Sequence, residues 1–190
     1  MSAGLDADII GNKGGDTTKQ CSVVAIYEDL GSRDLLLQLA DALARKFKNE
    51  VEFQFDWCRF KYLADPEIAR DAAQRATRAD LILLAPKSPS LPVYVQGWFE
   101  GWLANREAAE GALVLVENAR KGAARSLPLQ SLQSYVRHTA KRARLDYLRL
   151  NTGGSAAGMA NAVAGMTMSQ LEMGDLLARY NRPPHWGINE

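Results

Sequence analysis

The stretch Cys21–Asp29, CSVVAIYED, constrains the fold of this chain more than any other. Its β-branched and apolar residues end in two carboxylates, Glu28 and Asp29, and Gly31 and Ser32 follow at once. A buried strand that passes directly into a helix start is typical of the first unit of a parallel α/β sheet. Ligands of such sheets bind beyond the carboxyl ends of the strands, so the two acids lie where chemistry is expected.

The same succession of strand and helix continues to residue 150. Predicted strands cover residues 22–27, 51–57, 81–85, 112–117 and 145–150, and predicted helices cover 33–48 (with Ser32 as N-cap), 66–78, 92–108 and 129–142. The third and fourth strands are continuously apolar, as in strands buried on both faces, whereas the second and fifth alternate like edge strands. Right-handed crossovers then predict an α/β fold with a doubly wound, five-stranded parallel sheet of order 2-1-3-4-5, which resembles the flavodoxin-like three-layer sandwich.

Three further segments flank this predicted domain, which spans residues 21–151. Residues 1–20 are rich in Gly, Asp, Thr and Lys, which predicts a disordered N-terminal arm. Residues 152–168 are rich in Gly, Ala, Ser, Asn and Met and are predicted to form a flexible linker. Residues 169–190 begin with the capping box SQLE, which predicts a short amphipathic helix followed by an aromatic tail.

The composition argues against several classes of function. The 190 residues carry a net charge of +1, which favours neither a nucleic-acid-binding protein nor an acidic solvating chain. Cys21 and Cys58 are expected to be reduced core thiols, because no CxxC or metal-ligand spacing accompanies them. The N-terminus does not resemble a signal peptide, and no apolar run approaches the roughly 20 residues of a membrane span. We therefore expect a cytoplasmic protein with no membrane contact.

The acids at the strand ends resemble those of one known family. The acid pair Glu28 and Asp29 after the first strand, together with the strand order, is similar to the receiver domains of two-component signalling, and carboxylates gathered at this edge suit Mg²⁺. A receiver also has an acceptor aspartate after its third strand, a hydroxyl after its fourth and a lysine after its fifth. Here those places read Ala85-Pro86-Lys87-Ser88, Glu117-Asn118 and Asn151-Thr152. The resemblance implies a receiver-like domain without the phosphoacceptor, with Glu28 and Asp29 as candidate metal ligands.

Two enzymatic alternatives remain open in the sequence. Flavodoxins cradle a flavin phosphate in a hydroxyl- and glycine-rich loop after the first strand, but the loop from Glu28 to Ser32 carries two acids that repel a phosphate. We therefore expect no cofactor except, at most, Mg²⁺.

Glu100, on the helix after the third strand, is similar in place to the glutamate of nucleoside deoxyribosyltransferases, which implies a candidate nucleophile. The competing interpretation of Glu100 is a surface glutamate on an amphipathic helix.

Several residues suggest contacts with other molecules. Trp98 and Trp102 lie one turn apart on the helix that also carries Gly97 and Gly101, which suits core packing and also a close interface. Residues 118–145 contain seven basic residues and no acid, and Arg137, Lys141 and Arg144 are predicted to share one face of a helix. This patch is expected to face solvent or a protein, with nucleic acid as an alternative. The tail adds further candidate interaction residues, namely Leu176, Leu177, Tyr180, Trp186 and Ile188.

These patterns favour a receiver-like interaction or signalling domain over an enzyme, and we expect it to bind a protein partner or a second copy of itself. The first alternative is an enzyme that handles a small molecule or nucleotide in the acidic crevice, with Mg²⁺ or through Glu100. The second is a nucleic-acid-binding module that uses the basic patch of residues 118–145.

Overall fold

A five-stranded parallel sheet forms the centre of the protein. The computed structural model describes residues 19–106, 111–118, 127–153 and 156–166. The strands are β1 (Lys19–Tyr27), β2 (Val51–Arg59), β3 (Leu81–Ala85), β4 (Ala112–Glu117) and β5 (Asp146–Asn151), in the order β2-β1-β3-β4-β5. The helices are α1 (Leu30–Lys46), the 3₁₀ turn η1 (Phe60–Ala64), α2 (Pro66–Arg78), α3 (Val93–Asn105), α4 (Leu127–Arg142) and α5 (Ala156–Ala164). The predicted fold class and strand order are confirmed.

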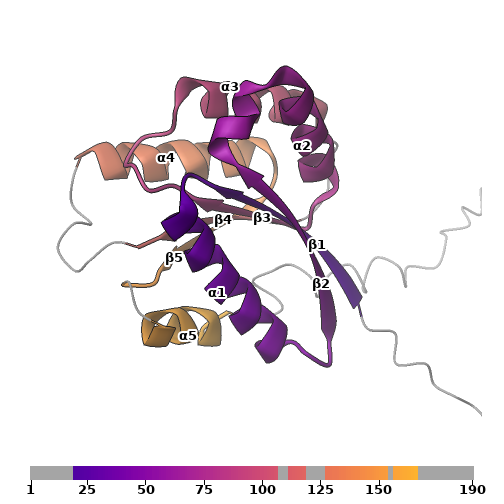
Figure 1. Cartoon of the computed structure of the whole chain (residues 1–190), viewed down its shortest axis with the longest axis vertical. Helices are drawn as coiled ribbons and strands as arrows, with labels where there is room; N and C mark the ends of the chain where they lie inside the picture. The colour runs from indigo at the N-terminus through magenta and orange to yellow at the C-terminus, as the bar shows by residue number, and fades with distance from the viewer. Residues whose placement is uncertain (1–18, 107–110, 119–126, 154–155, 167–190) are drawn as a thin grey trace, which may run out of the picture.

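Helices cover both faces of this sheet and make a three-layer sandwich (Figure 1). Helices α1 and α5 lie on one face, and α2, α3 and α4 lie on the other. Alternate residues of β1 belong to the two cores, since Val23 packs in the first and Val24 in the second. The apolar runs of β3 and β4 are buried throughout, as expected of strands covered on both faces.

The starts of two helices are set by aspartate caps. Helix α1 begins at Leu30, three residues before the predicted start, because the Asp29 carboxylate accepts a hydrogen bond of 2.8 Å from the backbone N–H of Ser32. The prediction of Ser32 as the cap is therefore wrong. Helix α2 begins as its sequence predicts, with Asp65 accepting from two backbone N–H groups and Pro66 in the first turn.

Helix α5 corrects the prediction of a flexible linker at residues 152–168. Its composition is rich in Gly and Ala, but alanine is the best helix former, and Met159, Val163 and Met166 are spaced to share one face. All three are buried in the core beneath α1. The ammonium of Lys46 donates hydrogen bonds to the carbonyl groups of Val163 (2.8 Å), Ala164 (3.0 Å) and Met166, which caps the end of α5. The segment is therefore helical because its apolar face packs against the core beneath α1.

At the amino ends of the strands, Asp80 joins β1 to β3. Its carboxylate accepts hydrogen bonds from the backbone N–H (2.7 Å) and the hydroxyl (2.8 Å) of Ser22 in β1. Gly111, just before β4, lies against the same turn with φ of 150°, and a Cβ there would stand 2.5 Å from the Asp80 carbonyl oxygen. Only glycine fits this position, so the amino edge is tightly packed.

Every helix in the ranges that the structure describes is too short or too polar to cross a lipid bilayer.

Candidate functional site

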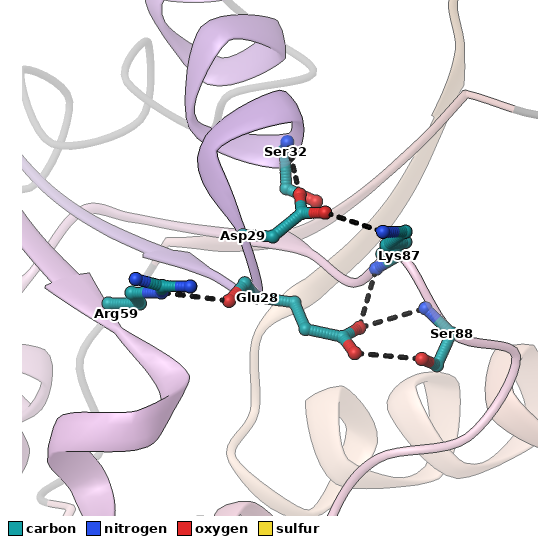
Figure 2. A network of polar contacts seen from close by, with 6 residues as sticks. All are labelled: Glu28, Asp29, Ser32, Arg59, Lys87 and Ser88. Carbon is teal, nitrogen blue, oxygen red and sulfur yellow. Dashed lines mark hydrogen bonds and ion pairs between the residues drawn. The ribbon is translucent and has the colours of Figure 1, made fainter.

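The carboxylate of Glu28 links the loop after β1 to the loop after β3 (Figure 2). One of its oxygens accepts hydrogen bonds from the backbone N–H groups of Lys87 (2.7 Å) and Ser88 (2.8 Å), and the other accepts from the Ser88 hydroxyl (2.7 Å). This is the point at which the strand order reverses, where parallel α/β sheets open a ligand crevice. We call these contacts of Glu28 with Lys87 and Ser88 the carboxylate latch.

Asp29 lies next to the latch and binds Ser32 and the side chain of Lys87 (Figure 2). It caps α1 and lies 3.0 Å from the ammonium of Lys87. The hydrogen bond from the Ser32 backbone lowers the pKa of Asp29 below its usual value, and the nearby Lys87 adds to the effect. The guanidinium of Arg59, at the end of β2, donates a hydrogen bond to the backbone carbonyl of Glu28.

The two acids therefore do not form a metal site. Each carboxylate is used by protein donors, and a magnesium site needs several oxygen ligands directed at one point. No group of three potential ligands occurs within the described part of the chain. The magnesium expected at Glu28 and Asp29 finds no support in this arrangement.

A third acid at the same edge is buried. Glu117, at the end of β4, is only 4% exposed and forms an ion pair with the Arg149 guanidinium of β5. The amide of Gln133 on α4 lies 3.1 and 3.2 Å from its two oxygens. This cluster fixes α4 against the ends of β4 and β5, and its charge is balanced internally.

A cavity of about 370 Å³ opens beside the latch, between the β3–α3 loop and α4. Pro89, Ser90 and Leu91 line one side directly after Ser88, and α4 supplies the other side. Its remaining lining residues are Gln96, Pro128, Ser131, Leu132 and Tyr135. Half of the lining residues are proline or leucine and half carry a polar group, a mixture of the kind found in small-molecule sites.

Tyr135 is the most unusual group of this cavity. Its hydroxyl is enclosed by protein atoms and lies beside Thr139 on the next turn of α4. Burial raises the pKa of Tyr135, the negative charge of Glu100 adds to the increase, and a hydrogen bond with Thr139 opposes it. Tyr135 therefore contributes its ring to the cavity wall, while its hydroxyl is turned into the protein.

Glu100 lies outside the carboxyl edge and lines neither of the two cavities described here. It is exposed on α3, and the Arg142 guanidinium of α4 holds both of its oxygens at 2.8 and 2.7 Å. The hydrogen bond from Arg142 lowers the pKa of Glu100. The structure thus places Glu100 as a surface helix-to-helix ion pair, which corrects its assignment as a candidate nucleophile.

The predicted interaction residues of α3 are mostly internal. Trp98 is 5% exposed and Trp102 is fully buried, with their rings stacked 6.0 Å apart. They line a groove of about 1090 Å³ between α2 and α3, into which Gly97 and Gly101 open without any atom near their missing Cβ. The tryptophans therefore pack mainly in the core, and a contact with another molecule in this groove stays a prediction.

The basic patch does not form one helical face. Arg137 and Lys141 are exposed on α4, but Arg144 follows the end of the helix in a left-handed conformation with φ of 56°. The guanidinium of Arg137 stacks over the ring of Tyr147 at 5.3 Å. The tail residues Leu176, Leu177, Tyr180, Trp186 and Ile188 lie outside the described residues, as does the predicted N-terminal arm up to residue 18.

No family model matches the chain, and no characterised protein matches it in sequence. Three similar solved structures are a short-chain flavodoxin associated with a bacterial microcompartment, the flavoenzyme NAD(P)H:(acceptor) oxidoreductase of Paracoccus denitrificans, and general stress protein 14 of Treponema denticola in complex with FMN. They are 9%, 16% and 14% identical, with TM-scores of 0.47, 0.40 and 0.46. They cover 83%, 72% and 83% of this chain and 99%, 78% and 99% of their own chains. At these identities and TM-scores, the likeness adds nothing to the fold that the strand order already shows.

These neighbours correct two predictions. They are a flavodoxin and flavin proteins and not receivers, so the main prediction of a non-catalytic, receiver-like interaction domain is wrong. The expectation of no cofactor is contradicted by the same proteins, one of which was solved with FMN. The first alternative, an enzyme that handles a small molecule or nucleotide in the acidic crevice, agrees better with them.

The loop after β1 does not fit the phosphate of a flavin nucleotide. The backbone N–H of Ser32 at the start of α1 already binds Asp29, and the N–H groups of Lys87 and Ser88 already bind Glu28. A phosphate at this edge would meet two carboxylates and no free backbone donor among these three. The cavity beside Tyr135, in contrast, has no charged residue in its lining.

Sequence reasoning missed the residues that complete this site. Lys87 and Ser88 were considered only as residues that stand where a receiver has its acceptor aspartate, and not as hydrogen-bond donors. No role in a site was assigned to Gln133 or Tyr135, which lie on α4. The one usable signal was the loop Pro86–Pro92, whose three prolines mark a stiff wall beyond a buried strand.

Proposed function

We propose that this protein binds a small, planar, uncharged heteroaromatic molecule in the cavity between the β3–α3 loop and α4. The lining of this cavity carries the proposal, because two prolines and two leucines offer apolar surface to a ring, and Tyr135 stands beside them. The cavity of about 370 Å³ lies within the roughly 300–1,000 Å³ range of small-molecule sites.

The lining chemistry supports a ring without charge. Pro89, Leu91, Pro128 and Leu132 offer apolar surface to the faces of a flat molecule, and the lining includes neither a lysine nor an arginine. The ionic groups nearby, Glu28 and Glu117, are already paired with donors of the protein. An anionic group on the ligand would therefore gain little here.

Riboflavin and FMN test this proposal well, because they share a ring system and differ by one phosphate. We expect the fluorescence of riboflavin to be quenched when the protein is added. Titrations followed by this signal should show that riboflavin binds at least as tightly as FMN. Lumichrome, adenosine and guanosine, followed by NMR shifts of residues 89–91 and 128–135, extend the panel to smaller rings.

A pair of tyrosine variants separates the site from the rest of the surface. Tyr135→Ala removes a ring from the cavity wall and should weaken binding about tenfold, because apolar contact is lost. Tyr94→Ala, on the exposed side of α3 and lining the other groove, should leave binding unchanged. Binding of none of the panel, or FMN binding tenfold more tightly than riboflavin, would contradict the proposal.

A further inference from the structure

A row of aromatic side chains along the edge strand β2 is incompletely covered. Phe53, Phe55 and Trp57 alternate with polar residues and lie on the α1 face of the sheet, with ring centroids 6.1 and 5.6 Å apart. All three are only partly buried, and Tyr27 of the neighbouring strand joins the row beside Trp57 at 6.5 Å. We call these four residues the aromatic row.

The row is open because of where the helices on this face lie. Helix α1 packs on β1 and β3 and reaches β2 only in part, while α5 lies on the far side of α1, next to β5. The rings are therefore only partly buried, and covering what remains exposed would contribute about 25 cal/mol for each Å² of apolar area removed from water.

The end of α5 brings the chain to one end of the row. Met166 is buried against α1, and the ammonium of Lys46 binds its carbonyl and those of the last turn of α5. Phe47, which follows Lys46 at the end of α1, contacts Phe53, the first ring of the row, with ring centroids 6.4 Å apart. The chain beyond Met166 therefore starts beside the aromatic row, on the same face of the sheet.

Residues 167–190 have the length and pattern to follow the row. Their sequence predicts a helix from the capping box at Ser169, with Met173, Leu176, Leu177 and Tyr180 on one face. Ten residues of helix extend about 15 Å at 1.5 Å per residue, and the strand from Phe53 to Trp57 extends about 13 Å at 3.3 Å per residue. The two lengths match.

Charge supports this segment over a second copy of the chain. Exposed Arg45 and Lys48 flank the end of α1, and the predicted helix brings Glu172 and Asp175 past this place. Pairing of β2 with β2 of a second copy about Gln54 would instead set Glu52 opposite Asp56, and opposed like charges destabilise a sheet.

We infer that residues 167–190 fold back on their own domain and lay an amphipathic helix along the aromatic row of Phe53, Phe55, Trp57 and Tyr27. The segment forms the third helix of the α1 and α5 face and shields the edge strand.

Paramagnetic relaxation in the full chain tests this contact. A nitroxide is attached at Asn181→Cys in a Cys58→Ser background; Cys21 stays unlabelled because burial raises its pKa to about 12. We expect the amide signals of residues 53–57 to lose most of their intensity, while those of Gly97 and Gly101 on the opposite face are retained. The replacement Leu176→Asp with Leu177→Asp should restore the lost signals, whereas Ala178→Asp, on the other side of the predicted helix, should not.

A mixture of spin-labelled chain and isotope-labelled, spin-free chain decides between intramolecular and intermolecular docking. Our inference expects no loss of signal in the mixture. Loss only in the mixture would assign the row to a second copy, and loss at the α2–α3 groove or nowhere in the domain would overturn the inference.

Discussion

The strands β1 and β3 are tied together at both ends by a carboxylate, and the two ties differ in what they hold. At the amino end, Asp80 accepts from the N–H and hydroxyl of Ser22, which lies within β1. At the carboxyl end, Glu28 accepts from the N–H groups of Lys87 and Ser88 and from the Ser88 hydroxyl, all in a loop. The same chemistry thus fastens strand to strand at one edge and strand to loop at the other.

This difference separates stability from ligand binding. Both bonds of Asp80 to Ser22 are partly buried and lie in a tightly packed edge closed by Gly111. One of the Glu28 bonds, to Lys87, is exposed, so water can replace it more easily. The loop that Glu28 holds continues directly into Pro89 and Leu91 of the cavity wall. We therefore expect Asp80 to matter mainly for folding and Glu28 mainly for the shape of the cavity.

The largest expected effect is that of Asp80→Ala. It leaves the partly buried N–H of Ser22 without an acceptor and should lower the free energy of unfolding by about 2–3 kcal/mol, measured by urea denaturation. Ser22→Ala is the matched control, because it removes only the hydroxyl and should cost about 1 kcal/mol. Equal losses for the two variants would show that the backbone bond contributes little.

A smaller loss of stability is expected for Glu28→Gln. The amide accepts through one oxygen only, and its NH₂ group faces donors, so the free energy of unfolding should fall by about 1–2 kcal/mol. Glu52→Gln, an exposed change of the same kind on β2, should stay within about 0.5 kcal/mol of the parent.

The same variant tests the comparison through binding. If the latch shapes the cavity, Glu28→Gln weakens the ligand identified by titration, and Asp80→Ala does not, at a temperature where both variants remain folded. An unchanged affinity in Glu28→Gln would break the proposed division between the two ties.

The smallest effect concerns Asp29 and depends on pH. Its pKa is lowered in the folded protein, so its carboxylate stabilises the fold above the unfolded pKa of 3.8, and this contribution is lost as the pH falls through the lower, folded value. Asp29→Asn keeps a cap but loses the charge, and at pH 7 it should cost about 0.5 kcal/mol. The difference from the parent should shrink below about pH 4 in chemical denaturation, and a gap that widened there would refute this account.

Much of the fold follows from the sequence because strand burial leaves a clear pattern. The apolar runs 81–85 and 112–117 and the alternation of 51–57 determine which strands are central and which lie at the edge. Helix α5 was missed because its composition resembles a linker, and only the contacts of Met159 and Val163 with the core of α1 make it a helix. Local helix propensity carries no information about packing against α1, which lies about a hundred residues earlier in the chain.

The site was less predictable for the same reason. The sequence places Glu28 at the end of a central strand, but its partners depend on the path of a loop 59 and 60 residues later. A carboxylate that binds a metal and one that binds backbone N–H groups have the same sequence pattern. The burial of the Tyr135 hydroxyl likewise depends on how α4 packs beside the loop, which no spacing indicates.

The strand order also bears on how the chain acquires this sheet as it leaves the ribosome. Every neighbouring pair of strands is parallel, so none forms as a hairpin, and each pairing awaits a complete crossover. The strand β1 emerges first and pairs with β2 on one side, but its other side stays open until β3 is synthesised. Ser22 and Glu28 therefore gain their partners from the same stretch of nascent chain, which contains Asp80 and Ser88. Both sets of hydrogen bonds form at the step that completes a three-stranded core.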